Sequence, residues 1–509
     1  MVYHVVVLKV KKDNYYWKIE LIKKEKGKNM KKFITLILML VAAIALVGCG
    51  GGDGGSVTGE IAYTDYNVET VENLNAQAPG SVVVSFRIPF GTTIENKIRE
   101  FADEFQVLYP SVTIELEVVS GYDEMKSATI QDINGGVVPT MTVGYPDHFA
   151  EYLISKAIVS LDKFIEDPNV GYTTEELADF LPGYVTENRQ FDKKGTYVGL
   201  PFNKSTEALY YNVEFFEEFG LEVPKTWDEM DALCAQVMEI VKTLEDDQYS
   251  WLGKIKTNLG NGEFIPCLYD SGGNLFTTII HQFGGKYTES IYKSNGLVDV
   301  QRGTLKFNTS NEAFEAMEYL QGLAKKGYVS MPDALELTYG SYAYNVGKAI
   351  MNIGSTGGSG YYADAICTTG VAPLPYKTED HKNVIQQGTN VCIMAQASDM
   401  QKLAAWLFIK YMLQPEKTAD FAMTTGYMPV RQSAYELQDY IDWLEGPTNA
   451  AKVHKATSQY ASEGWEYFVD AAWAGSSTVR NECETAMIQI MVNATDISQA
   501  LQDAVGRIG

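Results

Sequence analysis

Residues Gly199–Trp227 read GLPFNKSTEALYYNVEFFEEFGLEVPKTW and combine strand, turn and helix signals in one run. It begins with a short apolar run, continues through the polar residues 203–206, and resumes with the apolar segment Ala208–Tyr211. This pattern predicts a strand, a turn of small polar residues and a second strand. The hydroxyl and amide groups of the turn are therefore expected to be exposed where the backbone changes direction.

Helix signals fill the second half of the same stretch. Apolar residues at helical spacing are followed by Gly220, which suits the left-handed residue after a helix, and by Pro224, which prevents the helix from resuming. Thr226 and Glu229 then stand three residues apart, which is the spacing of a capping box at the start of another helix. Strands alternating with helices predict an α/β fold.

Each of these features alone is ordinary in α/β proteins, but the whole run closely resembles a known family signature. The pattern GLPF-x-x-ST-x-x-LYYN, then F-x-x-x-GL-x-x-PKTWDE, is typical of the family 1 extracellular solute-binding proteins of ABC importers, and it looks most like their glycerol-3-phosphate and sugar binders. The resemblance implies a periplasmic-binding-protein-like fold, in which crossing hinge strands join two α/β lobes around a ligand cleft. It implies lobe I at 81–203 plus 389–430, lobe II at 204–388 plus 431–509, and an ABC permease as partner.

Length and charge narrow the class of protein. The chain has 509 residues, which exceeds one hydrophobic core and predicts two lobes or more. Hydrophobic residues make up 46% and charged residues 21%, as in ordinary globular proteins. The net charge of −24 argues against a nucleic-acid partner, because phosphate backbones are bound by basic surfaces. An acidic surface keeps a protein dispersed but selects no substrate.

A bacterial export signal begins at Met30. Two lysines precede the apolar run 33–47, which is shorter than the about 20 residues that a membrane-spanning helix needs. The run ends in Leu-Val-Gly-Cys, which resembles the bacterial lipobox, so Cys49 is expected to become the lipidated N-terminus after removal of the signal peptide 30–48. Two or more acyl chains give stable membrane attachment. A plain signal anchor is the alternative.

The segments on either side of this signal complete the predicted layout. Residues 1–29 precede a complete signal peptide and are interpreted as an extension from a misassigned start, with Met30 as the initiator. Residues 49–80 begin glycine-rich and continue acidic, which predicts a flexible tether between the lipid and the folded part. The expected product is a lipid-anchored monomer on the extracellular face of the cytoplasmic membrane.

Cysteine and histidine usage argues against a metal or redox site. Beside Cys49 the chain holds five cysteines, an odd number without C-x-x-C spacing, and its five histidines are scattered. At least one thiol is therefore free, and most are expected to be small buried side chains. We expect no cofactor and no metal ion.

An α/β unit opens the part of the chain that is expected to fold. The apolar runs 81–86 and 112–119 flank a helical pattern and predict strand, helix, strand. In open α/β sheets, ligands bind beyond the carboxyl ends of the strands. Arg87, Tyr122 and the loop 144–147 are therefore candidates to line the cleft.

A glycine-rich loop follows a later strand. Residues 346–353 predict the strand, residues 354–360 read GSTGGSG, and a helix is expected from Tyr361. Free N–H groups and the dipole at such a helix N-terminus favour an anion. The loop does not end in Gly-Lys-Ser/Thr and is not a P-loop, and a purely structural loop is the alternative.

The family resemblance also implies a binding site. The pocket pattern of the glycerol-3-phosphate binders falls on Tyr122 in SGYDEM, Ser205 in FNKST, Ser355 in GSTGG, Gly388 in QQGT, Tyr427 in TGYMP and Arg480 in TVRNE. A bidentate arginine with hydroxyl and N–H donors suits a phosphate, and tyrosine rings suit the glycerol or sugar part. Arg87 completes the predicted ligand-binding set. For each of these residues taken alone, the alternative to ligand binding is a purely structural role.

Two departures from the family pattern concern the ligand. The family has a Trp-His pair where this chain has Arg87-Ile88-Pro89, and an acidic residue that aligns with Pro146, next to Asp147. An extra cation and a missing carboxylate predict a more anionic or larger ligand, such as a sugar phosphate or a glycerophosphodiester. The predicted function is capture of a glycerol phosphate or a related sugar or polyol for delivery to a permease.

Two other classes of protein are the alternatives. A secreted carbohydrate-active hydrolase needs two carboxyl groups about 5–10 Å apart, and the sequence shows no Asp/Glu pair in a recognisable motif, no Gly-x-Ser-x-Gly and no His-Glu-x-x-His. A surface lipoprotein without a transport role would lack a ligand-dependent hinge. We expect a binding protein and not an enzyme.

Overall fold

The computed structural model describes most of the chain. The described residues are 9–13, 16–20, 63–243 and 250–508. The predicted signal peptide and its lipidation site Cys49 lie outside them. Within the part that is described, no helix is both long and apolar enough to cross a lipid bilayer.

The chain divides into two compact units. The first is Met1–Gly59, in which strands β1 (Lys9–Asp13) and β2 (Tyr16–Glu20) pair antiparallel. The second is Glu60–Gly509 and contains all of the elements described below.

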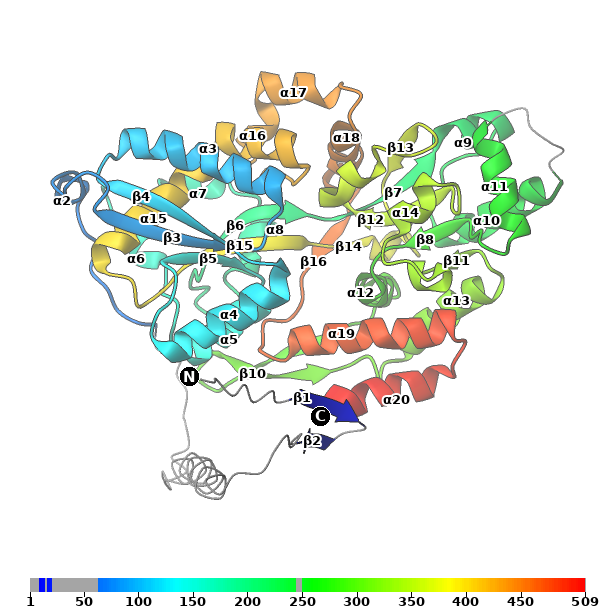
Figure 1. Ribbon diagram of the computed structural model, residues 1–509, viewed down its shortest axis with the longest axis horizontal. Helices are drawn as coiled ribbons and strands as arrows, with labels where there is room; N and C mark the ends of the chain where they lie inside the picture. The colour runs from blue at the N-terminus through cyan, green and yellow to red at the C-terminus, as the bar shows by residue number, and fades with distance from the viewer. Residues whose placement is uncertain (1–8, 14–15, 21–62, 244–249, 509) are drawn as a thin grey trace, which may run out of the picture. The chain divides into compact units, whose positions relative to one another are not determined.

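One five-stranded sheet is the centre of what we call the first lobe. In spatial order its strands are β4 (Val112–Val118), β3 (Val82–Ile88), β5 (Met141–Gly144), β15 (Gln387–Ile393) and β6 (Leu200–Ser205). β3 runs parallel to β4 and β5, whereas β15 runs antiparallel to β5 and β6. Helices flank this sheet in Figure 1: α3 (Thr92–Leu108), α4 (Gly121–Gly135), α5 (Pro146–Ile154), α15 (Asp399–Met412) and α16 (Pro415–Thr425).

A second five-stranded sheet is the centre of the second lobe. Its strands in spatial order are β11 (Val329–Ser330), β8 (Cys267–Tyr269), β12 (Met351–Ser355), β7 (Glu207–Asn212) and β13 (Thr369–Ala372). β8 is parallel to β11 and β12, and β7 is antiparallel to β12 and β13. The helices of this lobe are α9 (Val213–Phe219), α10 (Trp227–Thr243), α11 (Ser250–Gly260), α12 (Gly272–Gln282), α13 (Asn311–Lys325), α14 (Gly340–Asn345), α19 (Ser476–Met487) and α20 (Ile497–Ile508).

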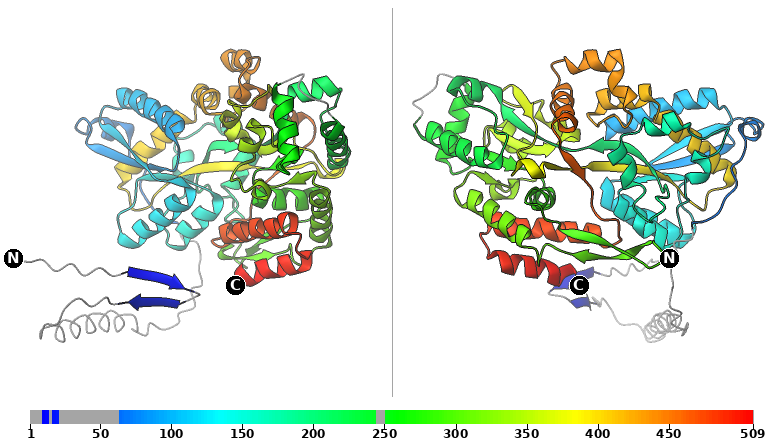
Figure 2. Two further views of the ribbon diagram at one scale, coloured as in Figure 1. Left: turned by 45° about the vertical axis from the view of Figure 1, so that its right-hand side comes forward. Right: turned by 180° about the vertical axis from the view of Figure 1, so that it is seen from behind.

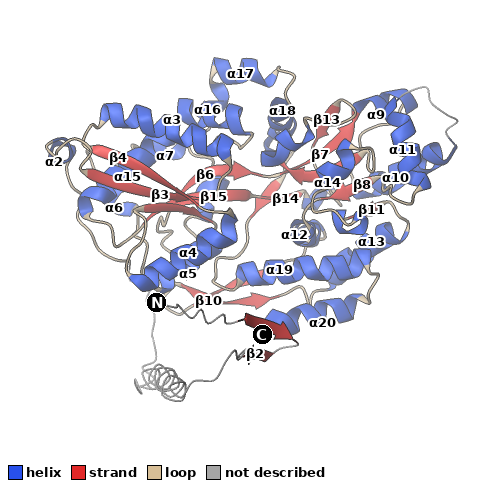
Figure 3. Cartoon of the chain, in the orientation of Figure 1, coloured by secondary structure: helices blue, strands red, loops and turns tan. Residues whose placement is uncertain are grey.

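Shorter elements connect and cover the two lobes (Figure 3). They are α2 (Val71–Asn75), α6 (Asp162–Ile165), α7 (Thr174–Ala178), α8 (Pro182–Glu187), β9 (Thr288–Tyr292), β10 (Val298–Leu305), β14 (Asn383–Ile385), α17 (Gln438–Leu444), α18 (Asn449–Ser462) and β16 (Glu466–Phe468). A 3₁₀ helix spans Thr356–Tyr362.

The chain passes from lobe to lobe in extended conformation. β6 of the first lobe is followed after one residue, Thr206, by β7 of the second, and β14 is followed after Gln386 by β15 (Figure 2). At a third passage, the Met428 N–H donates to the carbonyl of Lys204 at 2.6 Å. The predicted turn at 203–206 is therefore wrong, because these residues continue from one sheet into the other.

Partners far away in the chain explain why such polar residues form a strand. The Lys204 ammonium group is fully buried and pairs with the buried carboxylate of Glu187. The Asn203 side-chain oxygen accepts a hydrogen bond from the Thr389 backbone N–H at 3.2 Å. Buried polar groups are tolerated where each finds a partner, so these contacts replace the solvent that a turn would have provided.

A separate apolar cluster joins the lobes through the β9–β10 hairpin. Val298 and Val300 of β10 pack in one cluster with Phe149 and Tyr152 of α5. The Val298 N–H also donates to the Phe191 carbonyl at 2.9 Å. The second lobe is thus attached to the first outside the crossing strands as well.

Several local predictions are confirmed. Gly220 follows α9 with φ +60°, the left-handed conformation expected of it. The Glu229 N–H donates to Thr226 Oγ1 and the Thr226 N–H to Glu229 Oε2, both at 3.1 Å, so the capping box forms. The five cysteines of the described part are free thiols, and all but Cys367 are buried.

The predicted flexible tether is wrong for residues 63–80. Tyr66 and Leu74 in this segment are buried in the core of the first lobe. The Tyr66 ring lies 4.9 Å from that of Phe164, and its hydroxyl donates to the Ser160 carbonyl at 2.8 Å. Aromatic burial therefore fixes a stretch whose acidic composition indicated a linker.

The buried pair of Lys204 and Glu187 generates the first prediction. We expect Lys204→Met to lower the free energy of unfolding by about 3–5 kcal/mol, because it leaves the Glu187 carboxylate buried without its cation. Urea unfolding measures the change. The matched control is Lys455→Met, which removes an ion pair with Glu445 whose side chains are 57% and 71% exposed. Equal effects of the two substitutions would contradict the prediction.

Candidate functional site

A cavity of about 550 Å³ lies between the lobes. Its wall includes Tyr122, Tyr145 and Ser205 from the first lobe, and Ser355 and Arg480 from the second. The volume is within the range of small-molecule sites, which are about 300–1,000 Å³. Residues of α4, β6, β12 and α19 thus meet at one place from distant parts of the chain.

The structure brings together most of the residues that the sequence singled out. The cavity is lined by Tyr122, Ser205, Ser355, Gly388, Tyr427 and Arg480, and also by Asp147. Ser205 is the last residue of β6, and Ser355 is the last residue of β12. Their placement follows from strands that end at the boundary between the lobes.

The prediction that Arg87 binds the ligand is wrong, because Arg87 is not among the described residues that line the cavity. Its guanidinium group bonds to Glu117 Oε2 at 3.0 Å, to Asp132 Oδ2 at 2.5 Å and to Thr129 Oγ1 at 3.2 Å. These partners lie on β4 and α4, so Arg87 attaches helix to sheet within the first lobe. Its position at the carboxyl end of β3 was correct, but two nearby carboxylates hold its side chain elsewhere.

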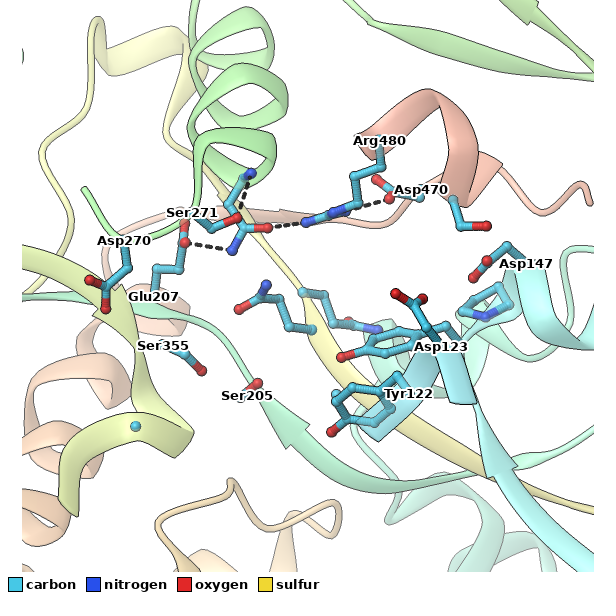
Figure 4. Close-up of a pocket in the computed structure, with 18 of the residues that line it drawn as sticks. Tyr122, Asp123, Asp147, Ser205, Glu207, Asp270, Ser271, Ser355, Asp470 and Arg480 are labelled. Atoms are coloured by element: carbon cyan, nitrogen blue, oxygen red, sulfur yellow. Dashed lines mark hydrogen bonds and ion pairs between the residues drawn. The ribbon is translucent and has the colours of Figure 1, made fainter. Parts of the chain in front are cut away.

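Arg480 is the centre of a chain of polar contacts (Figure 4). Its guanidinium group pairs with Asp470 and donates to the side-chain oxygen of Asn274. The Asn274 amide in turn donates to Glu207 Oε1 at 2.7 Å, and the Tyr269 hydroxyl donates to Glu207 Oε2. Arg480 is therefore held in position by neighbouring side chains.

The charge of the wall is mostly negative. Six acidic side chains line the described cavity: Asp123, Asp147, Glu187, Glu207, Asp270 and Asp470. Among the described lining residues, Arg480 is the one Lys or Arg side chain. In the close-up, Asp123 and Asp147 lie to one side of Arg480, with Glu207 and Asp270 to the other (Figure 4). The expected extra cation is therefore wrong, because Arg87 is not among the described lining residues, whereas Asp147 supplies a carboxylate next to Pro146.

Burial changes the titration of two of these carboxyl groups. It raises the pKa of Glu207 to about 7, although the hydrogen bonds from Tyr269 and Asn274 act in the opposite direction. It raises the pKa of Asp270 to about 6, against the hydrogen bond from the Gly340 N–H. Both groups therefore hold a proton at higher pH than an ordinary carboxyl group and lower the negative charge of the wall.

Tyrosine rings form the apolar part of the wall. The rings of Tyr122 and Tyr145 meet edge to face, with centroids 5.1 Å apart, and Phe90 packs against Tyr122. Tyr427 packs against Phe421 of α16. Such rings offer flat faces to the C–H groups of a polyol or sugar.

The glycine-rich loop differs from the predicted anion site. Residues Thr356–Tyr362 form a 3₁₀ helix, and no α-helix begins at Tyr361. A Cβ atom on Gly357 would lie 3.1 Å from the Tyr427 ring, and one on Gly358 would lie 3.3 Å from the Tyr361 ring. Two of the four glycines in the loop therefore leave room for tyrosine rings.

Contacts across the cavity also involve residues outside its wall. Lys126 of α4 donates to Ser477 Oγ of α19 at 2.7 Å and pairs with Glu151 of α5 at 2.7 Å. The two lobes thus touch at this edge of the cavity through a charged hydrogen bond. In the described part of the chain, no group of three or more His, Cys, Asp or Glu side chains is arranged to hold a metal ion.

Sequence reasoning missed Glu207, Asn274 and Asp470. Glu207 had a visible signal, because an acidic residue begins the apolar run EALYYN. Asn274 and Asp470 had none, since only the tertiary fold brings them to Arg480.

Comparisons with known proteins agree with this architecture. A family model described as bacterial extracellular solute-binding protein matches residues 100–448. The sn-glycerol-3-phosphate-binding periplasmic protein UgpB of Yersinia pestis bv. Antiqua is 26% identical over 363 residues, which cover 69% of this chain and 75% of that protein. UgpB of Salmonella typhimurium is 24% identical over 389 residues, which cover 73% and 81%.

Solved structures show the same fold. UgpB from Mycobacterium tuberculosis in complex with glycerophosphocholine matches with a TM-score of 0.65 and 19% identity, over 84% of this chain and 98% of that chain. Maltose-bound MalE3 of T. maritima matches with a TM-score of 0.60 and 17% identity, over the same shares. The predicted periplasmic-binding-protein-like fold with two α/β lobes is confirmed.

The raised pKa of Glu207 generates a prediction for stability. Between about pH 5 and about pH 7 the folded state keeps a proton on Glu207 that the unfolded chain releases. The free energy of unfolding therefore falls as the pH rises through this window. Across this pH window, we expect the free energy of unfolding of the wild-type protein to fall by on the order of 3 kcal/mol more than that of Glu207→Gln.

Urea unfolding at a series of pH values measures this difference. Asp270 is present in both proteins, so its own titration is largely common to the two profiles, and its charge contributes to the raised pKa of Glu207. The control is Glu445→Gln, because the Glu445 side chain is 71% exposed. Parallel profiles for the wild-type protein and Glu207→Gln would count against the prediction.

Proposed function

The chain belongs to the bacterial extracellular solute-binding proteins, and from this we propose that it captures a glycerophosphodiester and delivers it to an ABC permease. Family membership supports a binding protein over the hydrolase and the surface lipoprotein that the sequence left as alternatives. In this proposal the protein does no chemistry and acts through lobe closure alone.

The phosphate lies among Arg480, Ser205, Ser355 and Gly388 in this proposal. The single observation that carries it is the position of Arg480 as the one Lys or Arg side chain among the described lining residues. A guanidinium group offers paired N–H donors to phosphate oxygens, and serine hydroxyls add further donors. The relatives named as sn-glycerol-3-phosphate-binding support a phosphate ester as the ligand.

The acidic wall determines which phosphate ester fits. A monoester carries about −1.5 to −2 charges at neutral pH, whereas a diester carries one. Arg480 is the one Lys or Arg side chain among the described lining residues and already shares its charge with Asp470, so it can balance at most one negative charge of a ligand. A singly charged diester is therefore the better ligand. Asp123 and Asp147 accept hydrogen bonds from the glycerol hydroxyl groups, and Tyr122 and Tyr145 cover its C–H groups.

Binding and closure are coupled in this proposal. Ligand contacts come from both lobes, and Lys126 and Ser477 join the lobes at the edge of the cavity. A ligand that contacts both lobes favours the closed arrangement over the open one. The lobe limits stay a prediction, with lobe I at 81–203 plus 389–430 and lobe II at 204–388 plus 431–509.

The attachment to the cell surface is part of the proposal. We place the protein on the extracellular side as a monomer, held by acyl chains on Cys49. Membrane fractionation of Cys49→Ser tests this: release into the soluble fraction supports the anchor, and retention contradicts it.

Calorimetry with a panel of ligands tests the proposed function. The panel contains glycerol-3-phosphate, the diester glycerophosphoglycerol and the neutral sugar maltotriose. We expect the diester to bind most tightly. No response to either phosphate ester would overturn the proposal, and a response to maltotriose alone would replace it with an oligosaccharide binder.

Arg480 generates the mutational prediction. We expect Arg480→Ala to weaken binding of glycerophosphoglycerol by about 1.5–3 kcal/mol, the value of a hydrogen bond to a charged group. Titration calorimetry measures the change. The control is Arg507→Ala, which removes an arginine that pairs with Glu482 and does not line the cavity. Unchanged affinity in Arg480→Ala would show that the phosphate lies elsewhere.

A further inference from the structure

Three tyrosines form an exposed group at the rim of the cavity. Tyr339, Tyr342 and Tyr361 are 48%, 52% and 64% exposed. Large apolar surfaces gathered at one place on a soluble protein mark sites of interaction more often than single exposed side chains do. We call these three residues the rim tyrosines.

The rim tyrosines are continuous with the cavity. Tyr339 and Tyr361 belong to its wall. Their rings are nearly parallel, at 22° with centroids 6.3 Å apart, and the Tyr342 ring meets Tyr339 edge-on at 5.8 Å. Two similarly oriented aromatic faces therefore begin inside the site and continue outward from it.

The backbone holds these rings in place. Tyr339 precedes Gly340, whose N–H donates to Asp270 Oδ1 at 2.5 Å. The Tyr361 carbonyl accepts a hydrogen bond from the Asn345 amide at 2.8 Å, and its ring lies against Gly358. The segments that carry the rings are thus fixed to the second lobe, so little ordering is needed when a ligand binds.

We propose that the rim tyrosines bind a ring-shaped second alcohol of the ligand, a sugar or a cyclitol. This inference rests on the proposed function, in which the phosphate lies at Arg480 and joins glycerol to a second alcohol. The C–H face of a polyhydroxylated ring stacks on tyrosine, and its hydroxyl groups remain in contact with water. The ligand is then a glycerophosphodiester whose outer part is a ring.

The geometry favours a flat ring over a quaternary ammonium group. Ammonium recognition uses aromatic cages that surround the cation. The Tyr339 and Tyr361 rings are nearly parallel, with centroids 6.3 Å apart, and each is about half exposed or more, so their faces suit a flat ring that stays in contact with water. The experiment below also distinguishes this ligand subsite from a surface that contacts the permease.

The experiment compares two ligands of equal charge by titration calorimetry. Glycerophosphoinositol carries a ring on the phosphate, and glycerophosphoglycerol does not. Both are measured with the wild-type protein, Tyr339→Ala, Tyr361→Ala and the conservative variant Tyr361→Phe. The matched control is Tyr292→Ala, because Tyr292 is 50% exposed and does not line the cavity.

We expect Tyr361→Ala and Tyr339→Ala each to weaken binding of glycerophosphoinositol by about tenfold. Binding of glycerophosphoglycerol should weaken clearly less than that of glycerophosphoinositol in the two alanine variants, because its second glycerol offers less C–H surface than a ring, and Tyr361→Phe and Tyr292→Ala should retain the wild-type affinity for both ligands. This pattern supports the ring subsite, and it also shows that the alanine variants are folded.

Other outcomes overturn the inference in distinguishable ways. If the alanine variants bind both ligands with wild-type affinity, the subsite is absent while the proposed function stands. If in addition they lose transport in cells, the rim tyrosines contact the permease. Tighter binding of glycerophosphocholine than of glycerophosphoinositol, lost in the alanine variants, would make the occupant a cation. If neither diester binds the wild-type protein, the proposed function fails and the inference fails with it.

Discussion

The need to satisfy polar groups in the strands between the lobes governs this structure. The stretch from Asn203 to Thr206 runs through the interior without the water that polar residues normally contact. Each group that is buried without a partner costs free energy comparable to a lost hydrogen bond or more. Glu187 pairs with Lys204, the Ile385 carbonyl accepts from the Thr206 hydroxyl, and the Thr389 N–H donates to the Asn203 side chain, so these partners come from other segments of the chain. The crossing is therefore stable only when both lobes are folded around it.

The same requirement positions the binding site. Ser205 and Glu207 lie on either side of the passage between the sheets, and Gly388 pairs with Lys204 across it. Side chains that face the cavity are therefore attached to the backbone about which the lobes would rotate. In such an arrangement, ligand contacts and lobe orientation are linked through a few residues of the crossing strands.

How far the sequence predicts the molecule depends on how local each signal is. Gly220, Thr226 and Glu229 act over a few residues, and the helix boundaries at these positions were predicted correctly. Polar residues at 203–206 looked like a turn because their partners, such as Thr389, are remote in sequence. Arg87 was expected at the cavity because the sequence predicts its position at the end of a strand. The sequence does not show that Glu117 and Asp132 bind its side chain and keep it away from the cavity.

One glycine of the crossing has a consequence for reading related sequences. Gly388 has φ +87°, and a Cβ atom there would lie 1.8 Å from the Asn203 carbonyl oxygen. Any side chain would force the two strands apart, whatever the cavity contained. A glycine at this position in a homologue therefore indicates that the architecture is kept, and it does not identify the ligand. Ligand specificity has to be inferred from the side chains of the cavity wall that vary between homologues.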